Sequence, residues 1–303
     1  MKNCQQKIVN YLAYTFQVKH IFKVKNMPEL PEIISRAREM NLALPGKQIK
    51  AIEVVQPKCL NLPPKDFADS ITNAIIEEVN HHGKWIKVKT TRGWLLFNLG
   101  MGGEILLTTR QEMPVKYRLV FDFTDETCLV INFWWFGYAY HAAIDDLNSI
   151  PMITRLGPNV LDLSREEFSD LVHSQKRTVR VKAFLLDQSK MAGIGNAYIH
   201  DILFLAGLHP MRNLGSLSEE EIDWLHNAIN DGLTPSIEKG GAFYETTLHG
   251  NKGGFGTEDI MVGYRAGSPC PQCGTTIEKI RTGSTSSFIC PLCQPIDETN
   301  SPR

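Results

Sequence analysis

Two parts of this sequence have side chains that could carry chemistry, and the first lies between Met27 and Glu32. If translation starts at Met27 and the methionine is removed, Pro28 becomes a terminal secondary amine. Such an amine titrates at about pH 7.7–8, so a useful fraction is unprotonated at neutral pH. It can attack a sugar C1′ and form an iminium while Glu29 moves protons. The same residues also suit a plain helix start, because Pro31 has no N–H to leave unpaired there.

The second part holds two C-x-x-C pairs separated by sixteen residues: Cys270, Cys273, Cys290 and Cys293. This spacing is typical of a tetrahedral zinc site with four thiolate ligands. Four protein ligands leave no open position, so we predict one structural Zn²⁺. The remaining cysteines are scattered and are expected to be free thiols in a reducing compartment: Cys4, Cys59 and Cys128.

The segment between the cysteine pairs predicts a β-hairpin. Ile277 and Ile280 are apolar, whereas the residues around them, Arg281 included, are charged. The run ends in a Thr-Gly-Ser turn at 282–284, so the tip of the hairpin could reach a groove.

Residues 27–150 predict one helix followed by short strands. The helix is expected over 31–43 and ends before a Pro-Gly pair. Apolar and polar residues alternate over 84–89 and 119–123, and the runs 94–99 and 128–133 are largely apolar. Short strands joined by tight turns indicate an antiparallel β-sandwich.

The second half of the chain predicts helices. Residues 151–158 form a linker, and Ser164 and Ser218 each begin a segment with the pattern of a capping box. Basic residues are densest over 176–182. Between two predicted helices, the glycines of 191–198 allow tight turns, after which a helix start can bind a phosphate.

Length and charge set only wide limits. The 303 residues suggest about two domains. A net charge of −1 gives nucleic-acid binding no support, and no apolar run approaches the ~18 residues of a membrane span. We expect residues 1–26 to be a non-native or disordered extension, with Met27 as the true initiator. A natural protein that begins at Met1 would contradict this, because Pro28 would then lie within an amide.

These motifs resemble those of the formamidopyrimidine-DNA glycosylase / endonuclease VIII family, most closely its formamidopyrimidine branch. The resemblance runs from Met27 to about Cys293 and includes the amino-terminal motif, the Gly-x-Gly-Asn turn and the cysteine hairpin. It implies an α+β multidomain protein: a catalytic β-sandwich over 27–150, a helix-two-turns-helix domain over 158–262, a zinc-finger hairpin over 263–295 and a tail over 296–303.

The same resemblance implies roles for particular residues. Pro28 would be the nucleophile and Glu29 the acid–base group, with Lys84 at the active site holding the DNA backbone. The DNA-binding residues would be Met101, Phe136, Lys182, Asn196 and Arg281. Met101 and Phe136 would occupy the space left by the extruded base, Lys182 would lie near the lesion, and Asn196 would donate to a phosphate.

The chain departs from the family pattern where that pattern has arginines. Trp134 and Trp135 stand in place of an Arg pair, and Thr285 stands where an Arg grips phosphates, a role that Arg281 could take. An indole has one donor and cannot form the two-pronged contact of a guanidinium, so we expect weaker preference for the opposite base. Because neighbouring strand residues face opposite sides, at most one of the two tryptophans should meet DNA.

The resemblance therefore implies a bifunctional DNA glycosylase and abasic-site lyase of base excision repair. It would be a monomer that removes oxidised bases, with purines as the expected substrate, from damaged double-stranded DNA. It would bind no membrane and, in a bacterium, would work in the cytoplasm on the nucleoid. Two alternatives stay open: a non-catalytic reader of damaged or abasic DNA, and a general zinc-hairpin nucleic-acid module.

Overall fold

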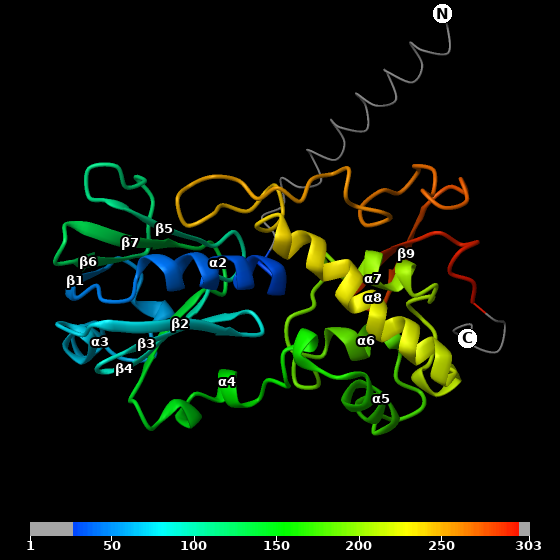
Figure 1. Ribbon diagram of the computed structural model, residues 1–303, viewed down its shortest axis with the longest axis horizontal. Helices are drawn as coiled ribbons and strands as arrows, with labels where there is room; N and C mark the ends of the chain where they lie inside the picture. The colour runs from blue at the N-terminus through cyan, green and yellow to red at the C-terminus, as the bar shows by residue number, and fades with distance from the viewer. Residues whose placement is uncertain (1–26, 297–303) are drawn as a thin grey trace, which may run out of the picture.

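The computed structural model describes residues 27–296. The extension over 1–26, Cys4 and most of the predicted tail lie outside the described residues. Figure 1 shows two bodies side by side, a β-rich one and a helical one. Helix α2 (Leu30–Ala43) runs along the β-rich body, and its amino-terminal end reaches the junction. The predicted helix over 31–43 is confirmed and starts one residue earlier.

The first domain is the predicted antiparallel sandwich. Its two sheets have the orders β1-β6-β7-β5 and β2-β3-β4-β8. The strands are β1 (Ile49–Val54), β2 (Ile76–His82), β3 (Trp85–Thr90), β4 (Gly93–Asn98), β5 (Glu104–Thr109), β6 (Leu119–Phe123), β7 (Thr127–Asn132) and β8 (Tyr138–Ala142), with helix α3 (Pro64–Ile71) between β1 and β2.

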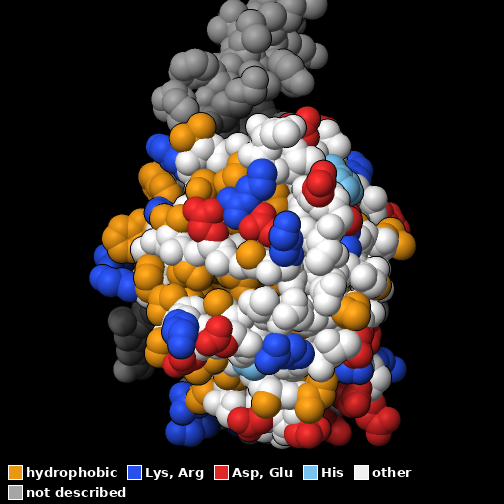
Figure 2. Space-filling view, turned by 90° about the vertical axis from the view of Figure 1, so that its left-hand side faces the viewer, with side chains coloured by type: hydrophobic (Ala, Val, Ile, Leu, Met, Phe, Trp, Pro, Cys, Tyr) orange, Lys and Arg blue, Asp and Glu red, His pale blue; other side chains and the backbone are white. Residues whose placement is uncertain are grey.

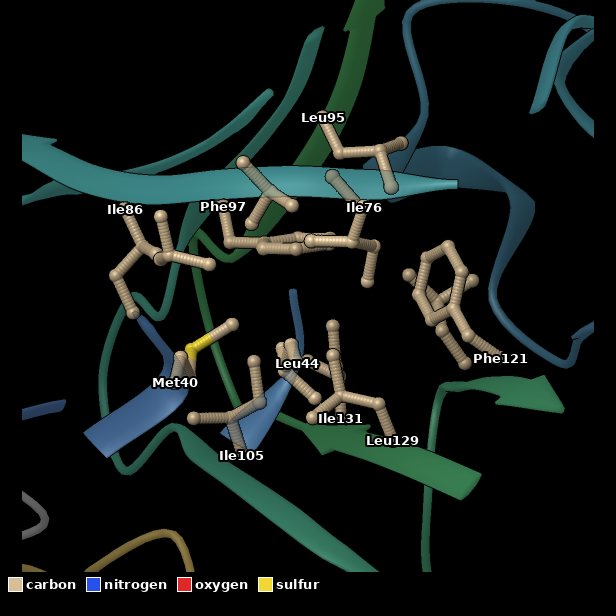
Figure 3. Close-up of a cluster of buried hydrophobic side chains, with 14 of the residues drawn as sticks. Met40, Leu44, Ile76, Ile86, Leu95, Phe97, Ile105, Phe121, Leu129 and Ile131 are labelled. Atoms are coloured by element: carbon tan, nitrogen blue, oxygen red, sulfur yellow. The ribbon is translucent and has the colours of Figure 1, made fainter. Parts of the chain in front are cut away.

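The space between the sheets is filled by apolar side chains from both of them (Figure 3). Phe97 and Phe121 meet edge to face with ring centroids 5.6 Å apart. Met40 of α2 and Leu44, which caps the end of the helix, are fully buried in the same cluster. The apolar face of α2 therefore anchors the helix to the sandwich and fixes the position of its amino-terminal end.

The expected linker is partly helical. Residues Pro151–Thr154 form the short helix α4. Ile150 and Ile153 are buried beside Trp85, which is on β3. The segment predicted as a linker therefore contains a short helix, because Pro151 can begin a helix and the isoleucines have an apolar surface to cover.

The second domain contains α5 (Arg165–His173), α6 (Val181–Leu186), α7 (Ile199–Leu205) and α8 (Glu219–Glu238). Both predicted capping boxes are present, at Ser164 and Ser218. Phe168, Leu185 and Ile202 lie in the domain's buried core. Within residues 27–296, the 3-10 turns are η1 (Pro57–Cys59), η2 (Leu147–Ser149), η3 (Val160–Asp162) and η4 (Leu214–Ser216).

The segment 240–257 crosses from the helical domain to the sandwich, as the orange loop along the top of Figure 1 shows. Leu248 is fully buried in the sandwich core, and its carbonyl accepts a hydrogen bond of 2.9 Å from the N–H of Leu107. Phe255 packs in the helical core. The loop is therefore fixed to both domains.

The carboxyl-terminal hairpin consists of β9 (Glu278–Thr282) and β10 (Thr285–Ile289), as predicted. Among residues 27–296, no helix combines the length and the apolar character that a membrane crossing requires. Figure 2 looks at the outer end of the sandwich, where basic and acidic side chains are interspersed. That face therefore lacks the continuous basic patch that is typical of a nucleic-acid-binding surface.

Candidate active site and DNA-binding surface

The site is built at the amino-terminal end of α2. Pro28 and Glu29 are buried directly before the first helical residue. The N–H of Leu30 donates to the carbonyl of Gly193, 3.1 Å away, so this end of the helix is bonded to the glycine turn of the second domain. The contact brings the predicted nucleophile to the junction of the domains.

The Glu29 carboxyl group is almost enclosed, with 4% of the residue exposed. Its Oε1 accepts a hydrogen bond of 2.9 Å from the N–H of Ala197, whereas Oε2 has no hydrogen-bond partner among the described residues. Burial raises the pKa of Glu29 to about 7, against the opposing effects of Lys84 and Ala197. A carboxyl group poised near neutrality can both give and take a proton.

Gly195 makes room for the two charged groups of the site. A Cβ at this position would lie 2.1 Å from Glu29 Oε1 and 2.5 Å from Lys84 Nζ. Lys84 is held there by the preceding Gly83, whose N–H donates to Asn159 Oδ1 at 2.6 Å. Three segments that are distant in the sequence therefore converge at one point.

The turn after Gly195 differs in one respect from the expectation. The N–H groups at the start of α7 were expected to face a DNA phosphate, but that of Ala197 is committed to Glu29. Asn196 is exposed, and its carbonyl accepts a hydrogen bond of 3.3 Å from Tyr264. Its side chain is therefore placed at the surface beside the active site.

Tyr264 is a site residue that the sequence did not reveal. Burial, with a smaller contribution from the charge of Glu29, raises its pKa to about 12. Its backbone is left-handed, with φ of 59°. It follows a turn in which Asp201 accepts three N–H bonds, from residues 261, 262 and 263. No local pattern signals this arrangement, because Asp201 and the turn are sixty residues apart.

Glu32 is a second residue whose role the sequence did not reveal, since its position indicated only a carboxylate in the first turn of a helix. Its Oε2 accepts from the N–H of Glu29 at 2.9 Å, and its Oε1 accepts from the N–H of Ala242 at 3.0 Å and from the hydroxyl of Tyr198. Burial raises the pKa of Glu32. One carboxyl group thus joins the catalytic end of α2, helix α7 and the 240–257 loop.

Trp134 and Trp135 both lie at the surface, although the alternation of a strand would bury one of them. The residues are 61% and 62% exposed, and the next residue, Phe136, is 63% exposed. They form a bend between β7 and β8, so strand alternation does not apply. Met101 is paired with this bend, its N–H donating to the carbonyl of Trp135 at 2.8 Å.

Lys182 lies under the hairpin and is 4% exposed. Its ammonium is within 3.0 Å of four neutral oxygens: Thr282 Oγ1, Thr285 Oγ1, Ser286 O and Ser287 Oγ. Burial lowers its pKa to about 8. Arg281 is exposed on β9. The structure thus places Lys182 as a tie between α6 and the hairpin, and Arg281 on the outer surface.

Comparison with known proteins identifies the whole arrangement. Residues 27–132 match the formamidopyrimidine-DNA glycosylase N-terminal domain, residues 156–247 the H2TH domain of the same glycosylase, and residues 267–296 the zinc finger found in FPG and IleRS. The formamidopyrimidine-DNA glycosylase of an Exiguobacterium species is 33% identical over 276 residues, covering 88% of this chain and 99% of the relative. The chain belongs to the formamidopyrimidine-DNA glycosylase family.

Other members agree with this assignment. The glycosylase of Pelotomaculum thermopropionicum is 33% identical and covers 89% of this chain and 100% of the relative. The Lactococcus lactis enzyme in complex with DNA containing an abasic site has a TM-score of 0.81 and 26% identity, covering 88% of this chain and 100% of that one. The predicted α+β organisation, with a sandwich, a helix-two-turns-helix domain and a zinc hairpin, is that of the family.

The zinc finger of this glycosylase-family chain has the geometry of a four-thiolate site. The Sγ atoms of its four cysteines all lie within 4.8 Å of one another, and the hydrogen-bonded pairs are 3.5–3.9 Å apart. A tetrahedron with Zn–S bonds of about 2.3 Å has S···S edges of about 3.8 Å. The residues fit one structural zinc ion.

Proposed function

We propose that this chain removes damaged bases from duplex DNA and cleaves the resulting abasic strand, as a bifunctional glycosylase of base excision repair. The observation that carries the proposal is the buried Glu29 carboxyl beside Pro28, with its pKa near 7 and Lys84 next to it. Membership of the glycosylase family supports the same reaction.

The chemistry requires the nitrogen of Pro28 to be free, which follows if the active form begins after Met27. The Pro28 nitrogen attacks C1′ of an extruded nucleotide, and the damaged base leaves with the electron pair of the glycosidic bond. Glu29 delivers a proton to the sugar ring oxygen, so that the ring opens to an iminium as the nitrogen loses its proton. Removal of a 2′ proton then breaks the C3′–O bond and cleaves the strand.

The finer assignments belong to the proposal as well. We take the substrate to be double-stranded DNA with oxidised purines, bound by a monomer. Met101, Phe136, Asn196 and Arg281 are surface groups for the DNA, and Lys182 acts through the hairpin that it holds. In a bacterial cell, this substrate places the protein on the nucleoid in the cytoplasm.

Borohydride trapping tests the proposal. The protein that starts at Met27 is mixed with a duplex containing an abasic site, reduced, and mapped by mass spectrometry, with Glu29→Gln in parallel. We expect a covalent adduct at Pro28. The absence of an adduct while tight binding persists would instead indicate a non-catalytic reader of damaged DNA. That alternative is motivated by the two tryptophans and Thr285, which stand in place of arginines.

A further inference from the structure

Trp134, Trp135 and Phe136 are three consecutive exposed aromatic residues, which we call the aromatic ledge. Each is more than 60% exposed, and the rings of Trp135 and Phe136 are tilted with centroids 6.2 Å apart. Three adjacent exposed aromatic side chains are unusual on a monomeric protein and mark a binding surface.

The backbone is constrained so that the ledge faces outward. Phe136 has φ of 56°, a left-handed conformation that a bulky residue rarely adopts. Gly100 allows the close approach of the neighbouring loop, since a Cβ there would lie 2.2 Å from the carbonyl oxygen of Trp135. A Cβ at Gly137 would meet the ring of Phe133 at 2.1 Å. Strain kept in place by such packing is typical of functional positions.

The ledge is connected to the active site by a short series of hydrogen bonds. Met101 pairs with Trp135, and the preceding Gly100 donates to Asn98 Oδ1 at 3.0 Å. Asn98 Nδ2 in turn donates to the carbonyl of Lys84 at 3.3 Å. The position of the ledge is thereby tied to the backbone of Lys84, the residue whose ammonium lies beside Glu29.

The chemistry of the ledge suits nucleobases better than it suits a protein partner. An enzyme that extrudes a nucleotide leaves an unpaired base and an open stack in the duplex. Aromatic side chains stack on all four bases, because every base has a π face. Close to the ledge, Arg118 is held by the carbonyl of Phe133 at 3.2 Å and offers a positive charge for the strand's phosphates.

We propose that the aromatic ledge stacks on bases of the undamaged strand beside the extruded nucleotide, and that the chain therefore accepts any base opposite the damage. The inference rests on the proposed function. It names the ledge residues as the reason why the protein would tolerate any base opposite the damaged one. Each indole has a single N–H donor, so the ledge holds the strand by stacking and lacks the paired donors that distinguish one base edge from another.

Binding to a stable abasic analogue tests this without any bond being broken. The protein starting at Met27 is titrated with four duplexes that carry tetrahydrofuran opposite A, C, G or T, and tryptophan fluorescence and Kd are recorded. We expect strong quenching and Kd values within about threefold of one another, whereas direct reading of a base would separate them by about fivefold to 150-fold.

Variants of the ledge identify the source of the signal. Trp134→Leu/Trp135→Leu should lose most of the quenching and bind about tenfold more weakly, while Trp134→Phe/Trp135→Phe should retain the affinity. The control is Trp224→Leu, which alters a half-exposed tryptophan on α8 and should keep both signals. Zinc content and thermal unfolding show that each variant is folded.

Three results would overturn the inference. They are a tenfold or greater preference for one opposite base, unchanged quenching and affinity in the double leucine variant, or a parent dimer that this variant converts to a monomer. Failure of the proposed function gives a different pattern. If no Pro28 adduct forms but quenching is intact and the four Kd values agree, the catalytic proposal fails and the stacking role of the ledge stands.

Discussion

At the scale of single residues, Glu29 is the candidate acid–base group whose pKa folding brings close to neutrality. Its carboxyl is buried at a domain junction, and one of its oxygens has no hydrogen-bond partner among the described residues. Burial disfavours the charged form more than the Lys84 ammonium favours it, which is why the pKa rises. The protein thereby gives up stability at neutral pH to hold a carboxyl group that can transfer a proton.

The pH dependence of stability should show this directly. Because the folded pKa of Glu29 is about 7 and its unfolded value is 4.5, its stabilising contribution is complete below pH 4.5 and is lost as the pH rises to about 7. Glu29→Gln should therefore be more stable than the parent at pH 8, by up to about 3 kcal/mol, and equal to it near pH 4.

Urea unfolding at several pH values measures this difference. Glu78→Gln, at an exposed position of β2, is the matched control and should follow the parent. A constant difference between Glu29→Gln and the parent from pH 4 to pH 8 would show that Glu29 does not titrate in this range.

At the scale of elements, the glycine turn before α7 has to fit around side chains of the first domain. Gly195→Ala places a methyl group within 2.1 Å of the Glu29 carboxylate and 2.5 Å of the Lys84 ammonium, so at least one of them must move. We expect borohydride adduct formation to fall about 100-fold with little loss of stability, since a displacement of 1 Å can cost this much. Gly250→Ala meets nothing within 4 Å and strains only a left-handed backbone with φ of 83°, so it should lose some stability but keep its activity.

The contact between α6 and the hairpin gives a second prediction. Lys182→Met keeps the apolar stem but removes the cation that the hairpin oxygens surround. Hydrogen bonds to charged groups contribute about 1.5–3 kcal/mol each, so hydrogen exchange over residues 278–289 should become faster.

Lys176→Met, an exposed change in the same basic cluster, is the control for Lys182→Met and should leave that exchange unchanged. Equal exchange in the two variants would mean that the ammonium does not hold the hairpin.

A feature could be predicted from the sequence when the residues that determine it are close together in the chain. Capping at Ser164 and the strand over 119–123 depend on neighbours a few residues apart. Both elements are confirmed, although Val120 on the second face of the strand is buried as well. The burial of Lys182 and the contacts of Glu32 depend on segments up to two hundred residues away, which no local pattern encodes. The exposure of both tryptophans could not be predicted for a related reason, because a bend stands where strand alternation would have buried one of them.

At the scale of the whole molecule, the zinc finger is attached to the helical domain and contributes only a small core of its own. Phe204 of α7 packs with Ile277 and Phe288 around the cysteines. A module of this size cannot bury enough apolar surface to fold alone, so its stability depends on the metal.

Removal of the metal should therefore act locally. The folded protein should contain one zinc ion per chain by elemental analysis. After treatment with a strong chelator, the hairpin should lose its protection from hydrogen exchange while the strands of the sandwich keep theirs, and DNA binding should fall sharply. Re-addition of zinc should restore both properties. Simultaneous loss of protection in the sandwich would show that the zinc finger is needed for the fold as a whole.

The enclosed Lys182 ammonium also has a consequence for how ionic strength acts on this protein. Dissolved ions screen exposed charges and compete for DNA phosphates, so affinity for DNA falls steeply as salt is added. The attraction between Lys182 and the hairpin joins a buried cation to neutral oxygens and displaces no counterions. A salt concentration that releases the DNA should leave the hairpin docked on α6. The protein would then dissociate from one duplex with its hairpin still in position to bind another.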